Sequence, residues 1–111
     1  MTIVEALHEF INSPSRNEWL ISPELEVYVR KGLHAFDGQI INTFDIANIQ
    51  DAPADYKGKG HFKQFMLAAE ATGLPVYVEC IHNPKLTNML EKNGYTIINI
   101  NSTTHAVKFP N

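Results

Sequence analysis

Hydrophobic residues recur along the chain with two different periods, which predict a mixture of helices and strands. Three segments carry apolar residues at intervals of three and four: residues 2–12, 61–72 and 84–93. Such spacing places the apolar side chains on one face of a helix. The ends of these helices are marked by residues typical of caps, which are Thr2 with Glu5, Gly73, Asn83 with Pro84, and Gly94.

The remaining apolar segments predict strands. Residues 25–30 alternate between apolar and polar side chains, as in a half-buried strand, and residues 40–49 form a long apolar run. Asp37 and Gly38 lie between these two segments and favour a tight turn, so we expect the two strands to pair as a hairpin. Further strands are expected at residues 19–21, 76–81, 95–100 and 105–109, the last of them at an edge of the sheet.

The order of these elements predicts the fold class. A hairpin followed by a strand–helix–strand crossover gives a mixed sheet, because the crossover makes two strands parallel while the hairpin makes two antiparallel. We therefore expect an α/β (α+β) fold with a mixed, mostly antiparallel, twisted sheet flanked by helices. A length of 111 residues fits one domain, spanning residues 1–111.

Composition narrows the classes of partner and compartment. The formal net charge of −3 argues against a general nucleic-acid binder, which would usually carry a broad basic face. The one cysteine, Cys80, lies in an apolar run, which predicts a buried residue in a reducing compartment. The N-terminus lacks the pattern of a signal peptide, and no apolar run approaches the ~20 residues that span a membrane. We expect a cytoplasmic protein without a membrane partner.

A glycine-rich segment lies between the long apolar strand and the second helix. It consists of Lys57, Gly58, Lys59, Gly60, His61 and Phe62. Two glycines let backbone N–H groups approach an anion that a Cβ would obstruct, and a helix N-terminus favours an anion at the same place. Three of the nine Lys and Arg residues fall within residues 57–63. The segment predicts a site for a phosphorylated ligand. The alternative is that the same residues form a tight strand-to-helix turn with solvated lysines.

The order of these motifs resembles that of the GNAT (Gcn5-related) N-acetyltransferases, over residues 26–100. In that family a strand leads into a pyrophosphate-binding loop, then a helix, a strand, a helix often opened by Asn, and a Lys-x-Gly-Phe/Tyr turn. Here residues 57–62 take the loop position, Asn83 takes the Asn position, and residues 91–95 close the pattern. Residues 76–95 are similar to short GNAT-like proteins of bacteriophages. Compared with the family, this chain has a shortened N-terminal region.

The resemblance implies that acetyl-CoA (coenzyme A) is the cofactor. Residues 57–62 would then hold its pyrophosphate. Ile49 and Gln50 would offer backbone groups to the pantetheine arm where two parallel strands splay apart, and Asn83 would hydrogen-bond the same arm. The alternatives are that Ile49 and Gln50 complete a sheet ladder and that Asn83 only caps its helix.

Acetyl transfer to an amine requires a base and stabilisation of an oxyanion. The resemblance points to a strand carboxylate, so Asp45 and Glu79 are the candidate catalytic residues. Each also fits a paired or solvent-facing strand residue, and a water could replace both. Leu90 stands where many active members carry a Tyr that protonates the departing thiolate. The alternative function is therefore a catalytically inactive module that binds CoA or a partner protein.

The remaining questions are a possible metal site, the role of Arg30 and Lys31, the acceptor and the oligomeric state. Cys80 and His82 are two residues apart, but no further ligands at a zinc-like spacing accompany them, so we expect no metal site. Arg30 with Lys31 would either meet an anionic acceptor or lie at a solvated strand end. The acceptor, a small molecule or a protein, is not specified. A shortened domain that leaves a sheet edge uncovered would favour a homodimer.

Overall fold

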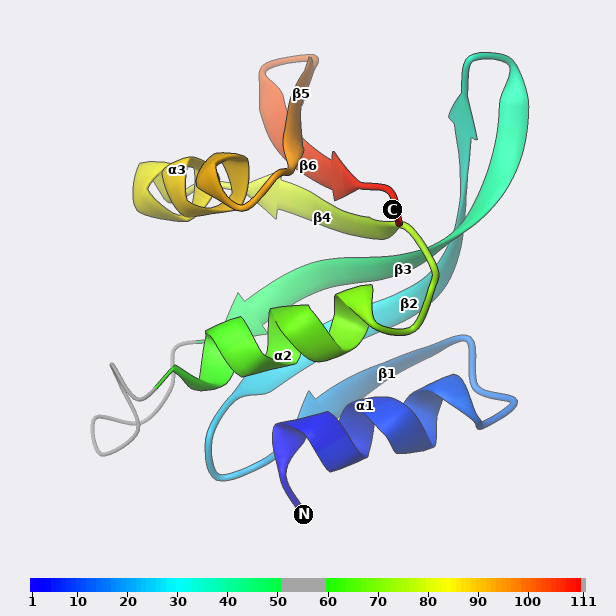
Figure 1. The fold of residues 1–111 in the computed structure, drawn as a ribbon, viewed down its shortest axis with the longest axis vertical. Coiled ribbons are helices and arrows are strands. Elements are labelled where there is room, and N and C mark those ends of the chain that lie inside the picture. The colour runs from blue at the N-terminus through cyan, green and yellow to red at the C-terminus, as the bar shows by residue number, and fades with distance from the viewer. Residues whose placement is uncertain (51–59, 111) are drawn as a thin grey trace.

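The computed structural model describes residues 1–50 and 60–110 of the chain (Figure 1). Within these residues three helices and six strands follow in an order that confirms the mixed α+β fold class. The elements are α1 Ile3–Ile11, β1 Asn17–Ile21, β2 Glu26–Phe36, β3 Gln39–Gln50, α2 His61–Glu70, β4 Val76–Ile81, α3 Pro84–Lys92, β5 Thr96–Ile100 and β6 Thr103–Lys108.

The six strands form one sheet in the order β1-β2-β3-β4-β6-β5. Strands β3 and β4 are parallel and the other neighbours are antiparallel, which confirms a mixed, mostly antiparallel sheet. The prediction that the last strand lies at an edge is wrong, because β6 pairs with β4 on one side and β5 on the other. Its adjacent residues Ala106 and Val107 are both buried, as suits an interior strand.

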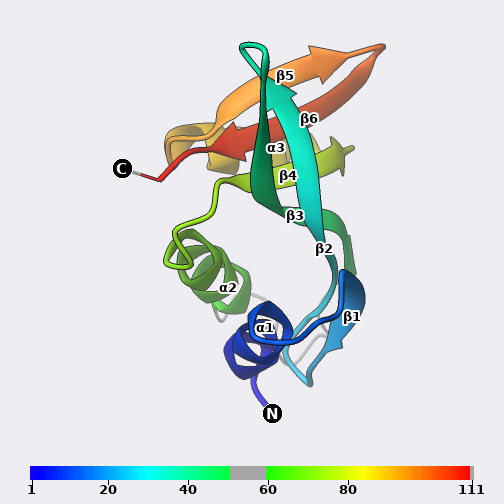
Figure 2. The ribbon, with the colours of Figure 1, turned by 90° about the vertical axis from the view of Figure 1, so that its right-hand side faces the viewer.

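The β2–β3 hairpin is longer than the sequence pattern predicts. Asp37 and Gly38 have φ of 48° and 79°, the positive values that a two-residue type I′ turn requires at both positions. This turn matches the twist of the strands, so pairing continues up to Phe36 opposite Gln39. Figure 2 shows this hairpin and the β5–β6 hairpin at the end of the molecule away from α1. Strand β2 therefore extends six residues past Arg30, to Phe36.

The predicted N-terminal caps of α1 and α3 are confirmed. At the C-terminal ends, Gly94 directly follows the C-cap of α3 as predicted, whereas α2 ends earlier than predicted and has Ala71, not Gly73, at its end. The Thr2 hydroxyl accepts a hydrogen bond from Glu5 N at 3.1 Å, and the Glu5 carboxylate accepts one from Thr2 N at 3.0 Å. Asn83 Oδ1 likewise accepts a hydrogen bond from Lys85 N at 2.9 Å at the start of α3. Each such cap stabilises its helix by about 1 kcal/mol. No helix in the described part of the chain is both long and apolar enough to cross a membrane.

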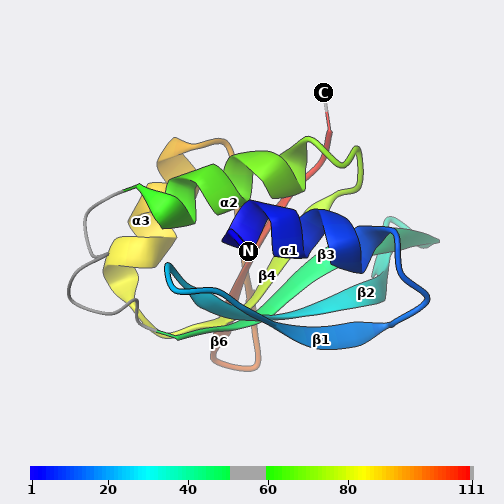
Figure 3. The ribbon, with the colours of Figure 1, turned by 90° about the horizontal axis from the view of Figure 1, so that it is seen from below.

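The helices pack on one face of the sheet. Figure 3 shows α1 and α2 side by side over the strands β1 to β3. The Phe44 ring of β3 contacts Phe10 of α1 and Phe65 of α2, with ring centroids 6.2 and 6.3 Å apart. Leu90 of α3 belongs to the same buried cluster. Burial of each such side chain stabilises the fold by roughly 2–3 kcal/mol.

The opposite face of the sheet carries a different set of side chains. Because side chains alternate along a strand, the neighbours of Phe44, which are Thr43 and Asp45, point away from the helices. Asp45 is paired across the sheet with Arg30 and with Tyr77, so these residues share its face. We call this surface the helix-free face, since none of the described helices packs on it.

Candidate functional site

A cleft opens between β3 and β4. The two parallel strands are paired from Phe44 opposite Val76 to Ile46 opposite Val78, and beyond this point they separate. The space between them is a cleft of about 380 Å³. Its lining consists of residues 46–49 of β3, residues 78–83 at the end of β4, and Leu86 of α3.

Two β-bulges explain why the strands separate. In β3, Asn48 pairs with Tyr28 and Ile46 with Val29, so Ala47 has no partner in β2. In β4, pairing with β6 shifts between Val78 and Ile81. A bulge bends its strand and increases its twist. Two bulges facing the same gap therefore turn β3 and β4 away from each other.

The second bulge also corrects a prediction about Cys80. The sequence pattern predicts a buried thiol, but the side chain of Cys80 is exposed and lines the cleft. Cys80 has a positive φ of 50°, and its backbone N donates a hydrogen bond to His105 Nδ1 at 3.3 Å. The bulge rotates Cys80 out of the alternation on which the prediction depended. His82 follows the end of β4 and is exposed.

The mouth of the cleft lies beside two helix N-termini. Figure 1 shows the carboxyl ends of β3 and β4 at the same end of the molecule as the starts of α2 and α3. Gly60 is the N-cap of α2 with φ 78°, a left-handed conformation that glycine adopts without strain. His61 Nδ1 lies 3.2 Å from Glu24 Oε2, and Phe62 packs against the core. The predicted binding residues Lys57, Gly58 and Lys59 lie outside the described residues.

Two of the other predicted cofactor residues line the cleft. Ile49 contributes from β3 and also pairs with Val27 of β2. Asn83 contributes from the far side while it caps α3, so its two predicted roles are compatible. Gln50 is the last residue of β3, opposite Glu26.

The two candidate carboxylates lie on the helix-free face in different environments. Asp45 is only 2% exposed. Its Oδ1 accepts a hydrogen bond from the Thr43 hydroxyl at 2.5 Å, and its Oδ2 lies 2.9 Å from His34 Nε2. Gly32 of β2 makes room for this carboxylate, because a Cβ there would stand 2.0 Å from Asp45 Oδ2. Asp45 is therefore enclosed, and it does not line the cleft.

Glu79 connects the cleft with the helix-free face. It lines the cleft, and its Oε2 accepts a hydrogen bond from the Arg30 guanidinium at 2.9 Å. This ion pair was not expected from the sequence, which suggested that Arg30 would meet an anionic acceptor or lie at a solvated strand end. One ligand atom each from His34, Asp45 and Glu79 lie within 4.8 Å of one another. Because Arg30 holds Glu79 in an ion pair and the Thr43 hydroxyl donates to Asp45, we interpret this set as a hydrogen-bonded polar cluster.

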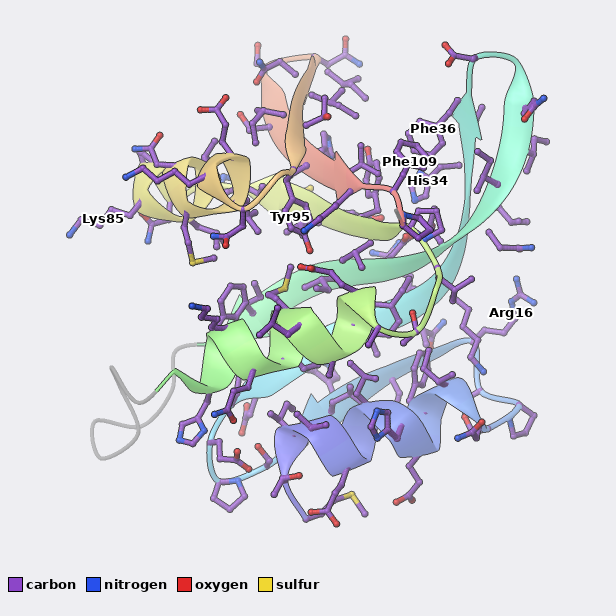
Figure 4. The ribbon with its side chains drawn as sticks, in the orientation of Figure 1. Arg16, His34, Phe36, Lys85, Tyr95 and Phe109 are labelled. Atoms are coloured by element: carbon purple, nitrogen blue, oxygen red, sulfur yellow. The ribbon has the colours of Figure 1, made fainter. Side chains whose placement is uncertain are left out.

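An aromatic group surrounds His34. The Tyr77 ring stacks on the His34 ring, with centroids 3.9 Å apart and an interplanar angle of 17°. Burial, then the negative charges of Glu79, Asp45 and Cys80, raise the pKa of Tyr77, so its phenol stays protonated well into alkaline solution. Phe36 lies beside His34 and contacts Phe109, with centroids 5.1 Å apart (Figure 4).

Sequence reasoning missed His34, Thr43 and Tyr77 as members of this site. It assigned Leu90 to the position of a catalytic Tyr, and the structure places Leu90 in the core, 1% exposed. Tyr95, the next aromatic along the chain, donates its hydroxyl hydrogen bond to Glu70 Oε2 at 2.8 Å. Neither residue belongs to the cleft lining.

Comparisons of the chain with protein-family models, with curated proteins and with solved structures find no match. The resemblance to GNAT acetyltransferases, including their short phage members, therefore stays a prediction.

Proposed function

We propose that the chain is an acetyl-CoA-dependent N-acetyltransferase that moves an acetyl group from the thioester to an acceptor amine. The observation that carries this proposal is the cleft between two parallel strands at their carboxyl ends. Ligands of open sheets bind at the carboxyl ends of parallel strands. Beyond Ile46 and Val78 the two strands do not pair with each other, so backbone groups that face the cleft are available to a ligand.

The chemistry of pantetheine fits such a cleft. Its arm is narrow and carries amide groups, which can pair with strand N–H and C=O groups in place of the missing ladder. A cleft of about 380 Å³ is within the usual range for a small-molecule site. Ile49 and Leu86 would contact the apolar parts of the arm, and Asn83 would contact a polar part.

The mouth of the cleft suits the pyrophosphate. The N-termini of α2 and α3 favour negative charge there. The exposed Lys63 and Lys85 lie in the first turns of these helices. The predicted loop at residues 57–59 leads directly into Gly60, and its part in binding remains a prediction. With the pyrophosphate at the mouth, the thioester would point to the closed end of the cleft, toward Glu79.

The reaction would be a direct attack. The acceptor nitrogen forms a bond to the thioester carbon, the carbon–sulfur bond breaks, and coenzyme A leaves as the thiolate. The proton lost by the amine passes to a base at the closed end of the cleft. We place this activity in the cytoplasm, where Cys80 would remain a free thiol.

Isothermal titration with acetyl-CoA tests the proposal, with a matched pair of tryptophan variants. Ala47→Trp fills the cleft at the bulge, and Ala35→Trp places the same ring on the distal part of β2. We expect binding to the unmodified chain, at least a tenfold loss for Ala47→Trp and less than a twofold change for Ala35→Trp. Absence of binding to the unmodified chain at high micromolar ligand would overturn the proposal.

The alternative is a GNAT-like module without catalysis, which binds CoA or contacts a partner protein. The apolar, buried Leu90 favours it, because this position supplies no acid for the thiolate. Thiol release from acetyl-CoA in the presence of a mixture of amines and peptides separates the two functions. A homodimer through the edge strands β1 or β5 is a further proposal that sedimentation can check.

A further inference from the structure

The carboxylate of Asp45 is arranged to hold a histidine, which changes the assignment of the base. Both of its oxygens are occupied, one by the Thr43 hydroxyl and one by His34. At 2% exposure, Asp45 is too buried to reach a bound amine. It can act on the reaction only through the imidazole that it contacts.

The contact with Asp45 fixes the tautomer of His34. An ionised carboxylate only accepts hydrogen bonds, so the His34 nitrogen that faces it, Nε2, must carry the proton. In the neutral ring the other nitrogen, Nδ1, then has a free lone pair. No hydrogen bond to Nδ1 is found among the described residues. The His34 side chain is 24% exposed, against 3% for that of Asp45, so of the two residues it is His34 that solvent can contact.

Tyr77 and Gly32 complete the support of this imidazole. The phenol ring of Tyr77 lies nearly parallel to the His34 ring and restricts its rotation. Gly32 leaves the space in which Asp45 approaches β2. A base held by packing and by hydrogen bonds on regular strands is positioned more precisely than one on a loop.

The titratable groups of the cluster around His34 lie on several strands. Arg30 lies on β2 and Asp45 on β3, Tyr77, Glu79 and Cys80 on β4, and His105 on β6. Arg30 forms an ion pair with Glu79, whereas Asp45 has no Lys or Arg partner within residues 1–50 and 60–110. This charge stabilises the imidazolium that forms when His34 takes a proton.

We propose that His34 is the general base for the acceptor amine and that Asp45 is its positioning residue. This inference rests on the proposed acetyl transfer, and Glu79 provides the geometric link, since it lines the cleft and lies within 4.8 Å of the His34–Asp45 pair. The ammonium form of the acceptor gives a proton to His34 Nδ1, and its freed lone pair forms the new C–N bond. The C–S bond electrons leave with the thiolate, which takes up the proton released by the amide nitrogen.

The first test measures transfer by His34→Gln, whose amide can still donate to Asp45. We expect kcat to fall by 10²- to 10⁴-fold, the usual contribution of general base catalysis, while the Kd for acetyl-CoA changes less than twofold. The matched control is His8→Gln at an exposed position of α1, with transfer unchanged. Added imidazole should restore part of the lost rate in His34→Gly and should leave the rate of His8→Gln unchanged.

The second test needs no cofactor. Nitrogen-15 NMR of the imidazoles should show the Nε2–H tautomer for His34, and Asp45→Asn should remove this preference. A His34 ring protonated at Nδ1, or in free exchange between tautomers, would overturn the claim that Asp45 positions His34.

The outcomes separate the two proposals. Transfer by the unmodified chain that His34→Gln does not reduce would overturn the role of His34 and leave acetyl transfer intact. Binding of acetyl-CoA without transfer to any amine would overturn both the enzyme and its base, and would favour the non-catalytic module.

Discussion

The two faces of the sheet use the same strands for different purposes. In β4, Val76 and Val78 face the helices and are fully or almost fully buried among apolar side chains. Between and after them, Tyr77 and Glu79 face the other side, where they meet His34 and Arg30. The alternation of a strand thus lets adjacent residues serve the core and the candidate site independently.

The helix-covered face depends on close packing, while the helix-free face depends on specific polar contacts. A change on the first face should therefore lower stability and leave site geometry alone. A change on the second should disturb named hydrogen bonds at a smaller cost in stability. Two predictions test this difference, and a third tests a polar contact that Tyr95 of the core makes with Glu70 of α2. They add to the variants proposed for the cleft and for His34.

The largest effect is expected in the core. Phe44→Ala should lower the free energy of unfolding by about 3–5 kcal/mol, because it removes a ring that contacts both α1 and α2 and leaves a cavity. Urea denaturation followed by circular dichroism measures this loss. The matched control is Phe109→Ala on the helix-free side, where the ring is 44% exposed and the loss should stay below about 1 kcal/mol. Similar losses at both positions would contradict the division between the faces.

An intermediate effect is expected at Gly32. In Gly32→Ala the new Cβ would stand 2.0 Å from Asp45 Oδ2, so the carboxylate must move away from His34. We expect a loss of about 1–3 kcal/mol, as for other overpacked sites. The same substitution in an Asp45→Ala background should cost much less, because the obstructing oxygen is absent. A double-mutant cycle with additive losses would show that Gly32 does not act through Asp45.

The smallest effect at neutral pH is expected for Tyr95→Phe. It removes the hydrogen bond to Glu70, which keeps its contact with Lys108 Nζ at 3.1 Å, and should cost about 1 kcal/mol.

The same variant should change the response to alkaline pH. Burial, and then the hydrogen bond to Glu70, raise the pKa of Tyr95 above its ordinary value of about 10.0. The folded state thus holds the phenol proton more tightly than the unfolded chain does. This contribution is complete below pH 10, and it is lost as the pH rises further. In Tyr95→Phe the free energy of unfolding should fall less steeply with pH above 10 than in the unmodified chain. The fall that remains would come from Tyr77, whose pKa is also raised. If the free energy of unfolding falls equally steeply with pH in both proteins, Tyr95 is not the source of the alkaline destabilisation.

Local signals predicted much of the fold. Caps such as Thr2 and Asn83 and the turn at Asp37 and Gly38 depend on neighbouring residues only, and the structure confirms each of them. The edge position assigned to the last strand failed because strand order depends on contacts between distant segments.

The candidate site was predicted less completely. Asp45 and Glu79 were identified, but His34 was not, because residues beyond Arg30 show no clear alternation. The turn at Asp37 and Gly38 could have revealed it, because a two-residue turn fixes the register of the hairpin. That register places Arg30 opposite Asp45 and His34 opposite Ile41. The bulges could not be predicted, since one extra residue in a strand leaves no local pattern.

The bulge at Cys80 has a practical consequence. It turns the single thiol of the chain outward into the cleft between β3 and β4. A thiol-reactive fluorophore would attach there and nowhere else, without any engineered cysteine. Its emission would report whether the cleft is occupied, and the rate of labelling would report how well a candidate ligand shields it.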